Sequence, residues 1–165
     1  FSNPHLKSQI SENEKYLFFI SSVGEDKFQK MKIVVDTNIL FSFFWQNSLT
    51  RKLLIASNFE LISPEFALIE LNKYSDEIIN RLNITKKEFN SQLEKLKAIV
   101  KFIKRQEYSQ FISEAAKISP DKNDSDFFAL CLKYSSFLWS NDSSLINQDK
   151  IKVLSTEDII DLLFE

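Results

Sequence analysis

The chain has 165 residues, with 21 Lys and Arg against 23 Asp and Glu, so its formal net charge is only −2. Hydrophobic residues make up 44% and charged residues 27%, which indicates one soluble globular domain and excludes disordered and fibrous proteins. The single glycine, Gly24, excludes the glycine-rich phosphate-binding loops, because neither GxxxxGK(S/T) nor GxGxxG can be written.

The residue types that remain point to carboxylate chemistry. Cys131 is the only cysteine and His5 the only histidine, which excludes a disulfide and a Cys/His zinc site and argues against a Ser-His-Asp triad. No apolar run approaches the roughly 18 residues that a membrane helix needs. We therefore expect a cytoplasmic protein with no membrane association.

The first 30 residues are set apart from the rest. The chain begins with Phe1, and its only methionine is Met31, which directly precedes an apolar run. We interpret residues 1–30 as an N-terminal extension of unknown role, an upstream, added or processed segment, and residues 31–165 as the functional domain. Within the extension, Tyr16–Ile20 has the composition of a short strand.

Strand-like and helix-like segments alternate along the functional domain. Ile33–Val35 is a wholly apolar, β-branched run, which is typical of a strand covered on both faces. Ser63-Pro64 is typical of an N-cap and the first residue of a helix, and Thr85 with Glu88 forms a capping-box pattern. In chain order, the pattern predicts a strand at 33–35, a helix at 49–57, a strand at 59–62, a helix from 64 to about 82, a helix from 85 to about 103, a short helix at 110–117, a helix at 124–134, a strand at 137–139, a strand at 152–154 and a helix capped by Ser155.

This alternation predicts a three-layer α/β/α sandwich with a central parallel sheet of four to five strands. In such sheets, ligands bind beyond the carboxyl ends of the strands. Asp36 directly follows the first strand, and Asp142 lies just past the strand that ends near Ser140, so both acids should lie at this edge. Glu70 and Asp124 fall on helices that begin after the same edge.

Helical geometry indicates which acids point inward. At about 100° per residue, Glu70 lies roughly 70° from the centre of the buried stripe of its helix, whereas Glu65 and Asp76 lie nearly opposite. Asp124 falls on the apolar side of its own helix. Asp121, three residues earlier, could reach the same place from the connection before that helix.

Each of these acids also has a purely structural interpretation. An Asp after a strand is often an Asx turn or a helix cap, and a helical Glu is often solvated. Several carboxylates at one edge nevertheless repel one another, and they persist there only with a cation or shared protons. Oxygen ligands without Cys or His suit hard divalent ions such as Mg²⁺ or Mn²⁺.

Four segments of the chain carry a resemblance to a known family. The segments are Val34-Val35-Asp36-Thr37-Asn38-Ile39-Leu40, Ile62-Ser63-Pro64 with Glu70-Leu71, Asp121-x-x-Asp124-x-x-Phe127-x-Ala129-Leu130 and Trp139-Ser140-Asn141-Asp142. In order and spacing they resemble the four motifs of the PIN-domain nucleases, over about residues 31–160. The resemblance implies an acidic catalytic and metal-binding cluster of Asp36, Glu70, Asp124 and Asp142, with Asp121 as the alternative to Asp124. It also implies polar support from Thr37, Asn38, Ser140 and Asn141.

The same resemblance implies an activity and its partners. It implies a Mg²⁺- or Mn²⁺-dependent endoribonuclease that cleaves single-stranded or structured RNA and leaves a 5′-phosphate and a 3′-hydroxyl. Its metal would lower the pKa of a bound water and stabilise the charge on the leaving oxygen. Small members of the family are often the toxin of a toxin–antitoxin pair, and many are dimers. An antitoxin protein and a second copy of the chain are therefore the expected protein partners.

Positive charge for RNA binding is concentrated between residues 81 and 105. This segment has eight basic and two acidic residues. On the predicted helix, one flank carries Lys86, Lys97, Lys101 and Lys104, and we expect these side chains to contact RNA phosphates. The alternative is an ordinary solvated helix face.

Other interpretations stay open beside the nuclease. A PIN-like fold without catalysis would be an RNA- or protein-binding module. A haloacid-dehalogenase-type enzyme would want an acid where Asn38 stands, and a receiver domain would want an acidic pair at Asp36. The stretch Phe41–Trp45 and Trp139 are expected in the core, although part of that stretch could instead form an exposed apolar patch for a partner.

Overall fold

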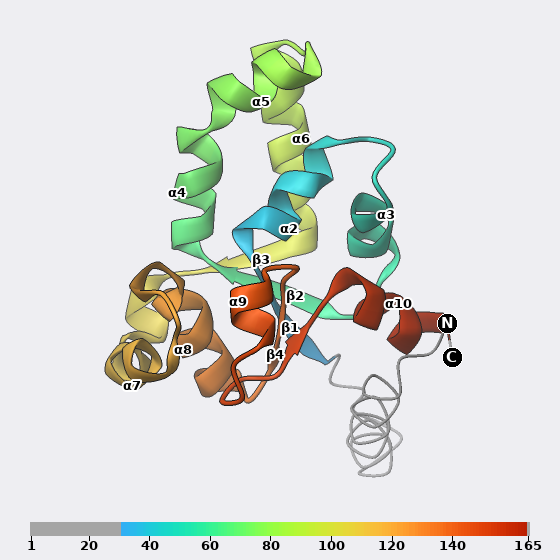
Figure 1. The fold of residues 1–165 in the computed structure, drawn as a ribbon. Helices are drawn as coiled ribbons and strands as arrows, with labels where there is room; N and C mark the ends of the chain where they lie inside the picture. Colours follow the sequence, from blue (N-terminus) through green and yellow to red (C-terminus); the bar gives the residue numbers. More distant parts are fainter. Residues whose placement is uncertain (1–30, 165) are drawn as a thin grey trace, which may run out of the picture.

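The computed structural model describes residues 31–164, and the predicted extension at 1–30, with its strand-like Tyr16–Ile20, lies outside the described residues. The described part is built on a five-stranded, all-parallel sheet in the order β3-β2-β1-β4-β5 (Figure 1). The strands are β1 (Lys32–Val35), β2 (Glu60–Pro64), β3 (Val100–Ile103), β4 (Phe137–Trp139) and β5 (Val153–Leu154).

Helices cover both faces of this sheet, as the alternating pattern predicts. In Figure 1, α4, α5 and α6 rise above the sheet, whereas α7 and α8 lie below it, and α8 packs against β1, β2 and β4. The predicted three-layer α/β/α fold is therefore confirmed. The helices are α2 (Thr37–Phe41), α3 (Leu49–Ala56), α4 (Glu65–Lys73), α5 (Ser75–Leu82), α6 (Lys86–Ile99), α7 (Ile112–Ile118), α8 (Ser125–Tyr134), α9 (Ser143–Ile146) and α10 (Thr156–Phe164), with 3₁₀ turns η1 (Ser42–Phe44), η2 (Arg105–Glu107), η3 (Ser109–Phe111) and η4 (Lys122–Asp124).

The helix predicted from residue 64 to 82 is wrong at its start and at its centre. Ser63 is not an N-cap but a fully buried residue of β2, and its hydroxyl donates to the Val35 carbonyl oxygen at 2.8 Å. Pro64 also belongs to β2 and serves as the N-cap residue of α4. Tyr74, with φ −96° and ψ 12°, separates α4 from α5. Side-chain bonding to the neighbouring strand thus outweighs the local capping preference of Ser63.

The helix predicted from residue 85 to 103 starts correctly but ends early. Both bonds of the capping box are present: Glu88 N–H donates to Thr85 Oγ1 at 3.1 Å, and Thr85 N–H donates to Glu88 Oε2 at 2.7 Å. The helix ends at Ile99, and the next four residues form β3. Val100 and Ile103 are buried in β3, which pairs with β2. Their three-residue spacing is typical of a helix face, which is why the pattern predicts a helix here.

Two short helices escape prediction because they are too short for a periodic pattern. The five residues of α2 directly follow Asp36, and the four residues of α9 directly follow Asp142. Each helix therefore begins directly after an acid that follows a strand, Asp36 after β1 and Asp142 after β4. Both helices lie at the carboxyl edge of the sheet.

The core is largely as predicted, with one exception. Trp139 and Phe43 are fully buried, and Phe44 is buried, but 37% of Trp45 is exposed. The prediction that Trp45 lies in the core is wrong because η1 ends at Phe44 and the chain turns to an extended conformation at Trp45. None of the helices in residues 31–164 has the length and apolar character of a membrane span.

Candidate active site

Asp36 occupies the position at which the strand order of the sheet reverses. It follows β1, which lies between β2 and β4, and its backbone N–H donates to the Trp139 carbonyl oxygen at 3.0 Å. Ligands of open α/β sheets bind at such switch points. The Asp36 carboxylate is only 7% exposed, and its Oδ2 accepts a hydrogen bond from the Ser140 hydroxyl at 2.7 Å.

Ser140 connects the ends of three strands. Its fully buried hydroxyl donates to Asp36 and accepts from the Asp142 N–H at 3.1 Å, while its own N–H donates to the Leu154 carbonyl oxygen at 3.0 Å. Ser140, which the sequence predicts to be a polar support, thus makes three hydrogen bonds at the strand ends. They hold Asp36 beside the segment that carries Asp142.

Glu70 joins the site through the buried Thr37. The Thr37 hydroxyl donates to Glu70 Oε1 at 3.3 Å, which connects the first turn of α2 to α4. Burial raises the pKa of Glu70, the Thr37 bond and Lys73 oppose this rise, and Asp36 adds to it. Burial likewise raises the pKa of Asp36, against the hydrogen bond from Ser140.

Asp124 is the acid whose pKa is moved furthest. It is half-buried at the start of α8, and its side chain makes no cap bond to that helix. Burial raises its pKa to about 6, and the nearby charges of Asp36, Asp121, Asp142 and Glu70 add to the rise. The four predicted acids and Asp121 therefore form one electrostatic group, which we call the acidic cluster.

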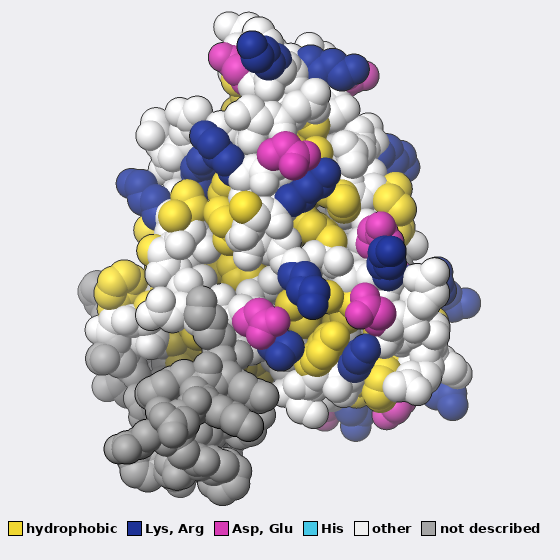
Figure 2. Space-filling view, turned by 180° about the vertical axis from the view of Figure 1, so that it is seen from behind, with side chains coloured by type: hydrophobic (Ala, Val, Ile, Leu, Met, Phe, Trp, Pro, Cys, Tyr) yellow, Lys and Arg dark blue, Asp and Glu magenta, His cyan; other side chains and the backbone are white. Residues whose placement is uncertain are grey.

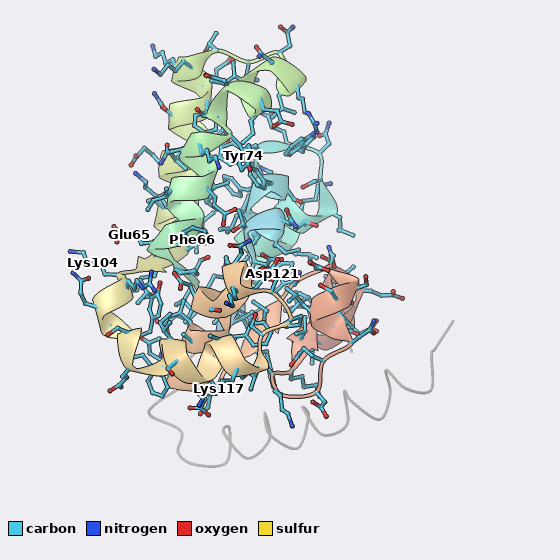
Figure 3. All side chains as sticks on the ribbon, turned by 60° about the vertical axis from the view of Figure 1, so that its left-hand side comes forward. Glu65, Phe66, Tyr74, Lys104, Lys117 and Asp121 are labelled. Atoms are coloured by element: carbon cyan, nitrogen blue, oxygen red, sulfur yellow. The ribbon has the colours of Figure 1, made fainter. Side chains whose placement is uncertain are left out.

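Asp121 and Asp142 are exposed members of the cluster that also cap helices. Asp142 Oδ1 accepts from the N–H of Ser144 at 2.9 Å and from its hydroxyl at 2.8 Å, which caps α9. Asp121 Oδ1 accepts from the Asn123 N–H at 3.0 Å, and Figure 3 shows Asp121 on the side of its layer that faces α2 and α4. The structural interpretation of these two acids therefore holds alongside their membership of the cluster.

The other two polar residues predicted as supports have different surroundings. Asn38 is exposed at the start of α2. Asn141 makes two hydrogen bonds to Thr156, the first residue of α10. Its Nδ2 donates to Thr156 Oγ1 at 2.9 Å, and its Oδ1 accepts from the Thr156 N–H at 2.8 Å. Thr156 also accepts from the Trp139 indole at 3.1 Å. Sequence reasoning missed Thr156, since only the folded chain brings it against Asn141.

The acidic cluster is not arranged as a finished metal site. Within residues 31–164, no group of three or more Asp, Glu, His or Cys side chains could hold a metal ion as it stands. Oxygens of Glu70 and Asp142 are instead occupied by Thr37 and Ser144. The donor set itself fits a hard divalent cation, because it consists only of carboxylates whose mutual repulsion a cation would relieve.

The four predicted RNA-binding lysines do not lie on one helix flank, so that arrangement is wrong. Lys86 begins α6 and Lys97 pairs with Glu94 at 3.2 Å on the same helix, whereas Lys101 is on β3. Lys104 follows β3, near the start of α4 in Figure 3, and hence lies at the carboxyl edge that carries the acidic cluster. The face in Figure 2 mixes basic with acidic side chains rather than presenting a uniform basic surface.

Replacing Ser140 by alanine should loosen the site and destabilise the protein. The variant leaves the buried Asp36 carboxylate and the Asp142 N–H without their shared partner, which costs about 1–3 kcal/mol. Chemical denaturation should detect this loss. Ser144→Ala, which removes an exposed hydroxyl bonded to Asp142, is the matched control and should cost less. Equal stability of the Ser140 variant and the wild type would contradict the proposed linking role of Ser140.

Comparison with known proteins bears on both the fold and the site. The family model described as PIN domain matches residues 34–160. A search of curated protein sequences finds no significant match. Among solved structures, the crystal structure of PAE2754 from Pyrobaculum aerophilum is similar, with a TM-score of 0.55 and 16% identity, covering 84% of this chain and 95% of that one. At this identity the structural likeness concerns the fold alone.

Proposed function

Because the chain belongs to the PIN-domain family of nucleases, we propose that it is a divalent-metal-dependent endoribonuclease that hydrolyses RNA phosphodiester bonds at the acidic cluster. One observation carries the proposal. Acids from four separate segments lie close enough that the charges of Asp36, Asp121, Asp142 and Glu70 add to the rise that burial causes in the pKa of Asp124, which reaches about 6. Such repulsion is unfavourable in a merely structural site, and a cation would turn it into attraction.

In this proposal, the acids of the cluster hold the metal ion, and neighbouring hydroxyl groups orient those acids. Asp36, Glu70, Asp124 and Asp142 would hold Mg²⁺ or Mn²⁺, which supplies Lewis-acid activation of a water and of the phosphodiester when bound. Ser140 fixes the direction of the Asp36 carboxylate, and Thr37 fixes that of Glu70. Asp124 loses its proton near pH 6 and is therefore charged at neutral pH.

The proposal is tested by cleavage of an end-labelled single-stranded RNA. We expect internal cleavage with Mg²⁺ or Mn²⁺, none with EDTA, and products that carry a 5′-phosphate and a 3′-hydroxyl. Cleavage that continues unchanged in EDTA would overturn the metal dependence. RNA binding without cleavage under any metal would instead favour the alternative, a catalytically inactive RNA-binding module.

Lysines near the carboxyl edge of the sheet should matter more for RNA binding than lysines far from it. Replacing Lys104 by Glu should weaken binding and reduce the slope of log affinity against log salt by about 1, because one phosphate contact is lost. Lys86→Glu, at the far end of α6, is the matched control and should leave the slope unchanged. Titrations of labelled RNA over a salt series measure the affinity and its salt slope for the wild type and the two variants. Equal slopes for all three proteins would exclude a phosphate contact by Lys104.

The protein partners rest on the family resemblance. We propose that the chain acts in the cytoplasm as the toxin of a toxin–antitoxin pair, with an antitoxin protein that blocks the acidic cluster, and that it forms a homodimer. Growth arrest on expression of the wild type, but not of an Asp36→Asn variant, would support the toxin role. Sedimentation analysis of the purified chain tests the dimer.

A further inference from the structure

A pocket of about 410 Å³ lies beside the acidic cluster, between α2, α4 and α5. Asn38 and Glu70 form part of its lining, so the pocket is continuous with the candidate active site. Its volume falls within the roughly 300–1,000 Å³ of typical small-ligand sites. A group that enters it would therefore lie next to a phosphate held at the cluster.

Two partly exposed aromatic side chains line this pocket. Trp45 is 37% exposed and Tyr74 is 40% exposed, whereas most other aromatic residues of the described chain are buried or half-buried. The Tyr74 ring lies edge-on to Phe41, with centroids 5.9 Å apart, and Figure 3 shows Tyr74 between α4 and α2. Exposed aromatic rings in one pocket next to a catalytic site offer flat surfaces to a flat ligand.

The pocket lining carries charges of both signs, unlike the acidic cluster. Arg81 and Glu77 line it as an ion pair at 2.8 Å, and Lys73 lies 5.5 Å from the centroid of the Tyr74 ring. Glu70 is the remaining acid of the lining. The lining thus has one cation and two carboxylates, and Lys73 beside Tyr74 adds a second cation, so the pocket suits a neutral ligand better than a phosphate. Lys73, between Tyr74 and Glu70, is placed to meet a phosphate that adjoins such a ligand.

We propose that this pocket binds a nucleobase of single-stranded RNA, from the nucleotide next to the cleaved phosphate, by stacking on Trp45 and Tyr74. The inference rests on the proposed ribonuclease function and adds to it the place where the substrate is positioned. Because every base has a π-face, stacking of this kind would favour unpaired RNA over duplex without selecting a sequence strongly. The nuclease would thus prefer single-stranded substrates.

The test uses short single-stranded RNAs that carry the fluorescent base 2-aminopurine at successive positions. Binding is measured with Mg²⁺ on the Asp36→Asn background, so that the RNA is not cut. We expect quenching at one position beside the bond that the wild type cleaves. Trp45→Ala and Tyr74→Leu should remove this quenching and weaken binding by about 5- to 100-fold. Tyr74→Phe should retain both, and Phe164→Ala, an exposed aromatic outside the pocket, is the matched control.

The possible failures of the two proposals are distinguishable. If the wild type binds and cleaves RNA while the Trp45 and Tyr74 variants keep full quenching and affinity, the stacking site is overturned and the ribonuclease proposal stands. If the wild type neither binds nor cleaves any single-stranded RNA, both proposals fall. Thermal melting of Tyr74→Leu, which retains apolar volume beside Phe41, verifies that the variant is folded.

Discussion

Replacing Asp36 by asparagine should reduce metal-dependent RNA cleavage by at least about 100-fold, the upper end of the loss for residues that only support a metal ligand. Asp36 is the most buried acid of the cluster and lies at the switch point of the sheet. Asparagine keeps the shape of the side chain and an acceptor for the Ser140 hydroxyl, so the fold should survive. The change removes mainly the negative charge that a divalent ion requires. Initial cleavage rates over a metal titration measure the effect.

Two further aspartates serve as matched comparisons. Asp124→Asn should be as damaging as Asp36→Asn, whereas Asp121→Asn should cost far less, because Asp121 is exposed and caps η4. Asp149→Asn, in an exposed loop, should have no effect. Equal cleavage by the wild type and the variants of Asp36 and Asp124 would refute catalysis at the acidic cluster. Loss of activity only in Asp121→Asn would make Asp121 the ligand in place of Asp124.

The metal-free protein should become less stable as the pH rises from about 4 to 7. The pKa of Asp124 is about 6 in the folded state, against an ordinary value of 3.8. Between these values the folded state keeps a proton that the unfolded state releases, so the free energy of unfolding falls as pH increases. Above about pH 6 the contribution of Asp124 levels off. The raised pKa values of Asp36 and Glu70 act in the same direction.

Removing the charge of Asp124 should therefore stabilise the protein while it abolishes activity. At pH 7.5 in EDTA, we expect Asp124→Asn to melt higher than the wild type by roughly 2–4 °C, the shift that each 1 kcal/mol gives in a chain of this size. At pH 4 the wild type and Asp124→Asn should have the same melting temperature. At pH 7.5, Mg²⁺ or Mn²⁺ should raise the melting temperature of the wild type more than that of Asp124→Asn. Asp149→Asn is the control. A variant that melts below the wild type at pH 7.5 would contradict the repulsion within the cluster.

Much of the fold could be predicted from local composition. The apolar β-branched run of β1 and the capping box of α6 lie where the sequence places them. Prediction failed where tertiary contacts decide the conformation. Ser63 resembles a helix cap but bonds to β1, and Val100 resembles a helix position but pairs with β2. Neither outcome is visible without knowing which strand lies alongside.

The candidate site could also be predicted only in part from the sequence. Strand ends and helix phase are sufficient to expect Asp36, Glu70 and Asp124 near one another, and the structure brings their charges together. Sequence reasoning offers a helix cap as an alternative for Asp142, which the structure shows at α9, but it cannot reveal that Trp45 and Tyr74 line one pocket. These features depend on two short helices and on a helix break, which carry no periodic signal.

Three acids of the cluster share one further property, since Asp36, Asp124 and Asp142 are the N-cap residues of α2, α8 and α9. The backbone amides that begin these helices carry positive partial charge next to these three acids. At Asp36, backbone hydrogen bonds with Thr37 and Asn38 oppose the rise that burial causes in its pKa. In the proposed function, a phosphate would meet the same helix starts once a cation neutralises the acids. In the proposed ribonuclease, helix starts would thus supply the backbone polarity that glycine-rich loops supply in other phosphate-binding proteins, although the chain has a single glycine.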